Sequence, residues 1–163
     1  MKVLFLDIDG VMIVKQSTVR RTNGGKGISD TKLKMLKQIV DRTGAEIVLV
    51  SSWMKGWDKD ETKITDIDAL YLLDRFSKYK LTILDKTTED FWFQRGLGIH
   101  NWLCMHKDVT SWAVLDDEMF DYGQYGIMER LVQIESSDFN GGGLQQRHVE
   151  KVLAILNLYC DDK

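Results

Sequence analysis

Several residue types that mark particular protein classes are scarce or missing in this sequence. The chain has no proline and only two cysteines, Cys104 and Cys160. Two cysteines are too few for a disulfide framework or a cysteine zinc site, so we expect a protein of a reducing compartment, the cytoplasm. The missing proline excludes no function on its own.

Long apolar runs and a strong net charge are also missing. No apolar run approaches the roughly 18 residues of a membrane span. Asp7 interrupts the first apolar stretch too early for a signal peptide. The net charge of −3 gives no overall attraction to nucleic acid. With 44% hydrophobic and 29% charged residues, the chain is expected to form one globular domain over residues 1–163, with no membrane partner. No obligate protein partner is indicated.

Apolar runs and amphipathic stretches alternate along the sequence. Strands are predicted over 2–6, 46–50, 81–84, 112–115 and 131–134, and helices over 29–41, 67–76, 95–106 and roughly 144–158. Ser29 and Gly44 flank the first helix as its N-cap and its C-terminal glycine. This alternation predicts an α/β fold with a parallel sheet and helices on both faces.

Polar side chains follow three of the predicted strands. Asp7 and Asp9 follow the first strand, Ser51 follows the second, and Asp116 and Asp117 follow the fourth. The carboxyl ends of parallel strands meet at one edge of a sheet, where α/β proteins bind ligands. We therefore expect these side chains to form one site.

The first acid pair has three interpretations. Asp7 and Asp9 point the same way along an extended chain, and adjacent carboxylates repel each other unless a cation lies between them. The pair is also compatible with a solvated Asp-x-Asp-Gly turn. A calcium loop is excluded, because the sixth and twelfth positions counted from Asp7 are Met12 and Thr18.

The motifs taken together resemble the haloacid dehalogenase-like superfamily. They are Asp-x-Asp-Gly-Val at 7–11, the strand-end serine, a basic residue at a helix start, and Asp-Asp at 116–117. Arg-Gly-x-x-Ile-x-x-Trp-Leu from Arg95, and Gly143-Leu144 before the last helix, resemble one branch of it. That branch is the phosphatase-like domains of phage and bacterial proteins, including RNA-repair polypeptides. The resemblance spans nearly the whole chain and implies a Rossmann-like fold with a minimal cap domain or none.

The resemblance also implies a reaction, the hydrolysis of a phosphate ester through an aspartyl-phosphate. An Asp at position 9 is similar to the phosphatases of the superfamily, whereas its ion-pumping ATPases carry Thr there. Asp7 would be the nucleophile and Asp9 the acid and base. The residues implied to bind the phosphoryl group are Ser51, Ser52, Gly10 and Arg95. Those implied to bind Mg²⁺ are Asp7, Asp116, Asp117 and the Asp9 carbonyl.

The basic residue has two candidates. Arg95 matches the branch pattern, because Gly96, Ile99 and the residues after them follow it in register. Lys86, after the predicted third strand, is the alternative, and either is compatible with a solvated surface charge. The chain departs from the branch at Gly98, where the pattern has an acidic residue that would hold the base.

The substrate is indicated by what surrounds the site. Residues 11–28 are long enough for only a short flap, and residues 52–80 for a small helical excursion. Because large cap domains usually confer small-molecule selectivity in the superfamily that the chain resembles, the resemblance implies a nearly open site. An open site suits a bulky phosphorylated substrate such as a nucleotide or a nucleic-acid end. The flap contains four basic residues, and three glycines that would make it mobile. It either binds along a polyanionic substrate or is an ordinary charged surface loop. These residues are Lys15, Arg20, Arg21, Lys26, Gly24, Gly25 and Gly27.

An aromatic cluster flanks the serine and arginine motifs. It is either a platform for stacking bases or packing for the excursion. Its members are Trp53, Trp57, Phe91, Trp92 and Phe93. The histidines, His100, His106 and His148, lack metal-ligand spacing and are expected on surfaces or helix faces. Residues 140–143 form a weak candidate for a glycine-rich phosphate loop.

Two non-enzymatic alternatives remain. A receiver-type phosphoacceptor module also has an acid pair after its first strand, but its phosphoacceptor follows a middle strand, near the place of Ser51 here. A degenerate binding domain would keep the fold without turnover, and the intact acids count against it.

Overall fold

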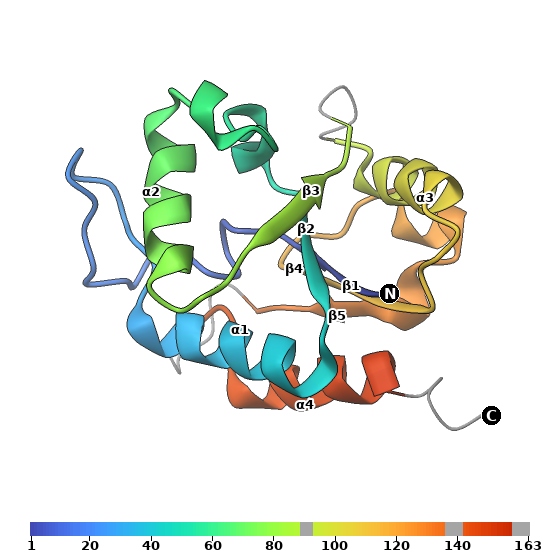
Figure 1. Ribbon diagram of the computed structural model, residues 1–163. Coiled ribbons are helices and arrows are strands. Elements are labelled where there is room, and N and C mark those ends of the chain that lie inside the picture. Colours follow the sequence, from blue (N-terminus) through green and yellow to red (C-terminus); the bar gives the residue numbers. More distant parts are fainter. Residues whose placement is uncertain (89–92, 136–141, 158–163) are drawn as a thin grey trace.

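A five-stranded parallel sheet forms the centre of the computed structural model, which describes residues 1–88, 93–135 and 142–157 (Figure 1). The strands are β1 (Lys2–Leu6), β2 (Glu46–Leu49), β3 (Ile83–Lys86), β4 (Ser111–Asp116) and β5 (Leu131–Gln133). The helices are α1 (Asp30–Thr43), α2 (Ile67–Ser77), α3 (Arg95–Met105) and α4 (Gln146–Asn157). Short 3₁₀ helices are η1 (Ser52–Lys55), η2 (Glu61–Lys63), η4 (Asp121–Tyr125) and η5 (Met128–Arg130). The predicted α/β fold is confirmed.

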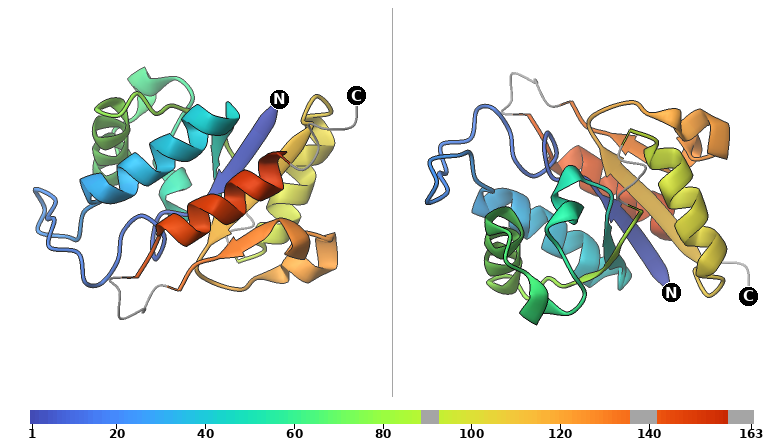
Figure 2. Two further views of the ribbon diagram at one scale, coloured as in Figure 1. Left: turned by 90° about the horizontal axis from the view of Figure 1, so that it is seen from below. Right: turned by 90° about the horizontal axis from the view of Figure 1, so that it is seen from above.

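Helices cover both faces of the sheet, and successive residues of each strand serve opposite faces. Leu4 and Leu6 of β1 pack into the core with α1 and α4, which lie side by side on one face (Figure 2). Val3 and Phe5 pack on the other face, with Ile99 of α3 and with η4. Because both faces are buried, the strands are almost continuously apolar.

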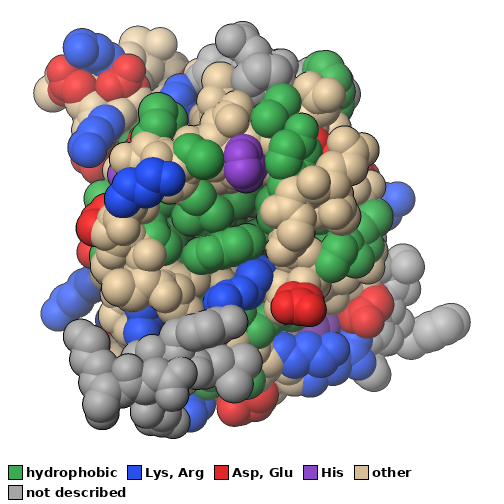
Figure 3. All heavy atoms as spheres, turned by 90° about the vertical axis from the view of Figure 1, so that its right-hand side faces the viewer, with side chains coloured by type: hydrophobic (Ala, Val, Ile, Leu, Met, Phe, Trp, Pro, Cys, Tyr) green, Lys and Arg blue, Asp and Glu red, His purple; other side chains and the backbone are tan. Residues whose placement is uncertain are grey.

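The side of the molecule over α3 has its own surface character. Figure 3 shows apolar side chains gathered in the middle of this side. Here half-buried hydrophobic residues pack against the buried residues between the sheet and α3. Charged side chains lie mainly toward its margins. Among the described residues, no helix is both long and apolar enough to cross a membrane.

The strand order places the end of β1 at the centre of the carboxyl edge. The order is β3-β2-β1-β4-β5, and Leu6 pairs with both Leu49 and Leu115. The order reverses beside β1, which is where doubly wound sheets bind their ligands. It also differs from the 2-1-3-4-5 order of the flavodoxin-like sheet that receiver modules use. The topology therefore counts against the receiver alternative.

The ends of α1 follow from its sequence, as expected. The Ser29 side chain accepts a hydrogen bond from the Lys32 N–H, which satisfies one of the free donors of the first turn. Gly44 has φ +68° and donates its N–H to Val40 O, so it ends the helix in the left-handed conformation.

The third strand was predicted two residues too early. It spans Ile83–Lys86 rather than 81–84, because Leu81 belongs to the end of α2. Lys80 has φ +53°, and the N–H groups of Lys80 and Leu81 donate to Ser77 O and Phe76 O. This is a Schellman ending, in which an apolar residue just past the helix packs back onto it. Leu81 is therefore buried without being in the sheet.

The last helix begins at Gln146 rather than 144, because the residues before it hold the flap. Leu144 donates its N–H to Val11 O (2.8 Å). Gly143 has φ +70°, and a Cβ there would lie 2.7 Å from the same Val11 oxygen. Lys32 Nζ donates to Gly142 O and Leu144 O at 2.7 and 3.0 Å. The predicted end of this helix at 158 lies outside the described residues.

The flap over 11–28 contains a small hairpin. Arg20 and Lys26 form an antiparallel bridge, and the Arg21 N–H donates to Gly25 O. Gly25 leaves room for the Arg21 guanidinium, which a Cβ would approach to 2.4 Å. A Cβ at Gly27 would lie 2.6 Å from the Tyr71 hydroxyl. These two glycines therefore allow the flap to pack closely against α2 and its own arginine.

Candidate active site

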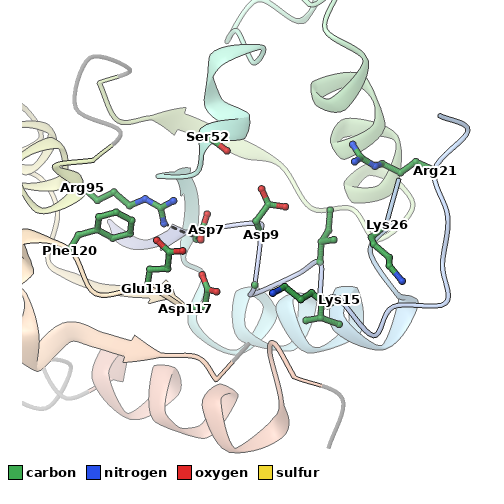
Figure 4. A pocket seen from close by; sticks show the side chains of 13 residues that line it. Asp7, Asp9, Lys15, Arg21, Lys26, Ser52, Arg95, Asp117, Glu118 and Phe120 are labelled. Atoms are coloured by element: carbon green, nitrogen blue, oxygen red, sulfur yellow. Dashed lines mark ion pairs between the residues drawn. The ribbon is translucent and has the colours of Figure 1, made fainter. Parts of the chain in front are cut away.

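A cavity of about 580 Å³ opens at the carboxyl edge of the sheet (Figure 4). Acidic side chains from the ends of β1 and β4 lie at its centre, Arg95 and Phe120 lie on one side, and three basic residues of the flap lie on the other. Its lining is Asp7, Asp9, Gly10, Ile13, Val14, Lys15, Arg21, Lys26, Ser52, Arg95, Asp117, Glu118 and Phe120.

Three predicted acids come together as a cluster. One carboxylate oxygen from each of Asp7, Asp116 and Asp117 lies within 4.8 Å of the others. Asp7 is 2% exposed and Asp116 is 0% exposed. Burial, and then the charge of Asp116, raise the pKa of Asp7 to about 7, although Arg95 acts in the opposite direction. The cluster is a set of hard oxygen ligands in which the negative charges repel one another.

Gly10 leaves space for one of these acids. It has φ +75°, and a Cβ there would lie 1.9 Å from Asp117 Oδ2. Any other residue at this position would displace the Asp117 carboxylate from the cluster. The described residues therefore fit a Mg²⁺ ion, since they supply carboxylate oxygens and keep a side chain out of their space.

Strand alternation explains why Arg95 meets two of the acids. Asp7 and Asp116 continue the alternation of Phe5 and Val114, so both face α3, and Arg95 is the first residue of α3. Arg95 Nη1 lies 3.0 Å from Asp7 Oδ2 and also pairs with Asp116. Burial alone would lower the Arg95 pKa, but the two carboxylates outweigh burial and raise it.

The start of α3 is held by residues beyond the predicted motifs. The Asp121 carboxylate accepts hydrogen bonds from Gly96 N (2.7 Å) and Leu97 N (3.2 Å), so it caps a helix whose own N-cap makes no side-chain bond. The Arg95 Cζ lies 4.3 Å from the centre of the Phe120 ring, a cation–π contact. Both contacts position the Arg95 guanidinium.

Both carboxylate oxygens of Asp116 accept hydrogen bonds. Its Oδ2 accepts from the Tyr122 hydroxyl (2.6 Å) and from Arg95, and its Oδ1 accepts from Glu118 N (2.9 Å). Burial, and then the Asp116 charge, raise the pKa of Tyr122, so its hydroxyl stays protonated and donates. The sequence reading missed Glu118, Phe120, Asp121 and Tyr122. Their only signal was position, since all four follow the second acid pair within five residues.

Lys86, the alternative to Arg95, points elsewhere. Its Nζ donates to Met54 O (3.0 Å) and Trp57 O (2.8 Å), and Lys86 does not line the cavity. It therefore fixes the beginning of the excursion. The departure at Gly98 faces Thr87, since a Cβ would lie 3.5 Å from Thr87 Cβ.

The two serines after β2 have different surroundings. Ser51 is 0% exposed, and its hydroxyl accepts a bond from Trp53 N (3.4 Å) as the N-cap of η1. Ser52 is exposed and lines the cavity. Ser52 is therefore the serine that faces the space where a substrate would lie.

Asp9 extends past the cluster toward the excursion. Its Oδ2 accepts a hydrogen bond from the indole N–H of Trp53 at 2.9 Å. Trp53 and Trp57 are only 8% and 4% exposed, so these two pack the excursion onto the core, and the base-stacking interpretation is wrong for them. Phe91 and Trp92 lie outside the described residues, and Phe93 is exposed.

None of the histidines lies in a metal-ligating group within the parts of the chain that the structure describes. His100 packs against the Tyr125 ring, and His106 stacks on Trp102. His148 lies on the buried face of α4, as the helix-face expectation allows, and its Nδ1 accepts from Gln145 N (3.1 Å) while its Nε2 meets Glu135 (3.0 Å). Of the glycine-rich 140–143 loop, residues 140–141 lie outside the described part.

The order of strands and the placement of the two acid pairs, the strand-end serine and the helix-start arginine define a haloacid dehalogenase-like (HAD) domain. Residues 3–149 match the family model described as "HAD domain in Swiss Army Knife RNA repair proteins", and the chain belongs to this family. The resemblance seen in the motifs is thereby confirmed. Comparison with curated proteins finds no match.

Proposed function

We propose that the protein is a Mg²⁺-dependent phosphomonoesterase that works through an aspartyl-phosphate. The observation that carries this proposal is the arrangement at the end of β1. Asp7 lies at the centre of the carboxyl edge, next to two further acids and paired with Arg95, in a cavity open to solvent. A buried carboxylate beside a fixed guanidinium suits attack on a phosphoryl group, whose charge the guanidinium offsets.

The reaction has two steps. In the first, an Asp7 oxygen attacks phosphorus in line, the ester P–O bond breaks, and Asp9 donates a proton to the leaving oxygen. In the second, Asp9 takes a proton from water, the water oxygen attacks phosphorus, and the bond to Asp7 breaks. Arg95 neutralises the phosphoryl oxygens throughout. Ser52 supplies its hydroxyl to the phosphoryl group, and Ser51, which caps η1, holds Ser52 at the cavity.

A Mg²⁺ ion held by Asp7, Asp116, Asp117 and the Asp9 carbonyl would screen the repulsion between these acids and a phosphate. Gly10 serves the same site by leaving room for Asp117.

The proposed substrate is a nucleotide or a nucleic-acid end. The chain offers only the flap and the excursion in the place of a cap, so a long substrate has access to Asp7. The flap side of the cavity is lined by Lys15, Arg21 and Lys26 (Figure 4). These basic side chains attract a polyanion locally, although the net charge of the chain is −3. The RNA repair in the family's description agrees with this substrate class.

The test is hydrolysis of an aryl phosphate and of 3′- and 5′-phosphorylated oligonucleotides, with Mg²⁺ or EDTA. We expect Mg²⁺-dependent release of phosphate that Asp7→Asn abolishes. Asp41→Asn, on the exposed end of α1, is the matched control and should retain activity. Absence of turnover on every substrate would overturn the proposal in favour of a binding domain that has lost turnover.

A further inference from the structure

Asp9 makes one side-chain contact that the proposed reaction does not by itself require. The Trp53 indole N–H donates to Asp9 Oδ2 at 2.9 Å. Asp9 is exposed to the cavity, whereas Trp53 is buried beneath the excursion, so a core residue reaches the acid at the rim. Among the described residues, no partner is found for the second Asp9 oxygen.

Trp53 is itself held on several sides. The Arg21 Cζ lies 5.1 Å from the centre of its ring, and the Tyr71 ring lies 6.4 Å from it at a tilt of 53°. Arg21 pairs with Asp68 of α2, and Tyr71 accepts a hydrogen bond from Ile28 N (2.8 Å) at the end of the flap. The indole therefore has a fixed orientation set by the flap and by α2.

We propose that Trp53 is a positioning residue for Asp9: it holds one carboxyl oxygen, so that only the other oxygen exchanges a proton with the substrate. This inference rests on the proposed function. An indole N–H is a donor only, so the oxygen that it contacts stays an acceptor. Oδ2 of Asp9 is that oxygen. A carbonyl oxygen accepts this bond better than a hydroxyl oxygen does, so the contact favours Oδ2 as the carbonyl and leaves Oδ1 as the oxygen that faces the leaving group with the transferable proton. Without the indole, either oxygen carries the proton and the carboxyl group rotates freely.

The proton transfers balance around Oδ1. As the ester P–O bond breaks, the Oδ1 proton moves to the leaving oxygen and Oδ1 becomes a carboxylate oxygen. As water attacks the aspartyl-phosphate, one water proton moves to Oδ1 and restores the acid. The Trp53 N–H stays on Oδ2 in both steps and exchanges no proton with the substrate.

A positioning role and a merely structural role predict different dependence on the leaving group. A nucleoside leaves as an alkoxide and needs the proton, whereas dinitrophenolate leaves without one. If Trp53 only packs the excursion, its removal lowers kcat/KM equally for both substrates. If Trp53 positions Asp9, its removal lowers kcat/KM mainly for the nucleotide.

The experiment compares kcat/KM for a mononucleotide and for 2,4-dinitrophenyl phosphate, because kcat/KM reports steps up to departure of the leaving group. Trp53→Phe keeps an aromatic side chain at this buried position and removes the N–H, although the benzene ring is smaller than the indole. We expect kcat/KM to fall about tenfold to a hundredfold for the mononucleotide and less than about twofold for the dinitrophenyl ester. Asp9→Asn should show the same pattern more strongly. Trp112→Phe, on the opposite side of β1, is the matched control and should change neither.

A second measurement tests the contact without turnover. In ¹⁵N spectra, the indole resonance that Trp53→Phe removes should shift when Asp9 is changed to Ala, and the Trp112 indole resonance should not. An unmoved Trp53 resonance would overturn the proposal, as would equal loss on both substrates by an active Trp53→Phe enzyme. A wild-type protein without Asp7-dependent turnover would instead overturn the proposed function, and the role of Asp9 with it.

Discussion

Two arginines on opposite sides of the cavity are held by the same kinds of contact and serve different purposes. Arg95 pairs with Asp7 and Asp116 and lies 4.3 Å over the Phe120 ring. Arg21 pairs with Asp68 and lies 5.1 Å over the Trp53 ring. Each guanidinium therefore has an acid along its edge and an aromatic ring on its face.

The difference lies in the acids. Those of Arg95 are buried at the ends of central strands, whereas Asp68 is 41% exposed on α2. A guanidinium among buried, crowded carboxylates keeps strong electrostatic effects, because little solvent screens it. Solvent screens the charge of Arg21 more strongly, so its main contribution is to hold the flap against the excursion. The comparison teaches that the burial of its acidic partners separates the arginine proposed to act on a reaction from the one that holds the fold.

Removal of Arg95 gives the largest expected effect. Arg95→Ala should lower kcat for an aryl phosphate about 10²–10³-fold, because the phosphoryl charge loses its fixed cation. Steady-state kinetics with Mg²⁺ measure this. Arg21→Ala should lower it far less, and a larger effect of Arg21→Ala would break the comparison.

Mg²⁺ should bind the acids beside Arg95 and should not bind Asp68, the acid that pairs with Arg21. Mg²⁺ at about one hundred times its Kd should stabilise the protein by about 2.7 kcal/mol, which is roughly 5–10 °C in Tm for a chain of this size. Thermal unfolding with Mg²⁺ and with EDTA measures the shift. Asp117→Asn should remove most of it, whereas Asp68→Asn should preserve it. A shift that survives in Asp117→Asn would place the ion elsewhere.

Lys86 is a third basic residue near the site, and its removal should affect stability more than turnover, in contrast to the removal of Arg95. Lys86→Met keeps the stem and removes the charged donor to two carbonyls, so stability should fall by about 1.5–3 kcal/mol in urea unfolding. Turnover per folded molecule should change less than about threefold. A loss of kcat like that of Arg95→Ala would instead assign the phosphate to Lys86.

The smallest expected effect concerns salt. If Arg21 also meets a nucleic-acid strand, Arg21→Gln should reduce the slope of log(kcat/KM) against log[salt] for an oligonucleotide by about 0.7. Arg20→Gln is the matched control, because the Arg20 side chain bonds Ser17 O within the flap and does not line the cavity. Equal slopes for the wild type and Arg21→Gln would restrict Arg21 to clamping.

Much of the fold and part of the site followed from the sequence, because local patterns determine both. Apolar runs located the strands, and the first turn of polar residues after each run located Asp7 and Asp116 at one edge. The exception was β3, where Leu81 was assigned to the strand. An apolar residue that closes a helix end has the same sequence signature as one that begins a strand.

The contacts that hold the site were not predictable in the same way. Trp53 meets Asp9 from another loop, and Asp121 caps α3 from 25 positions beyond Gly96. No periodicity connects such pairs, since they depend on how two connections fold over one sheet edge. The sequence therefore predicted the residues that we propose to react and left out most of the residues that orient them.

The bond between Leu144 and Val11 has a consequence for the order in which the site and its flap form during synthesis. Both acid pairs have left the ribosome once residue 117 has emerged, but the base of the flap meets its anchor only when residues 142–144 follow. A nascent chain stopped between these points contains both acid pairs before its flap is anchored. The anchor can be disturbed in the full chain as well, because a Cβ at Gly143 would lie 2.7 Å from Val11 O. Protease cleavage within residues 11–28 should therefore be faster in Gly143→Val than in the wild type.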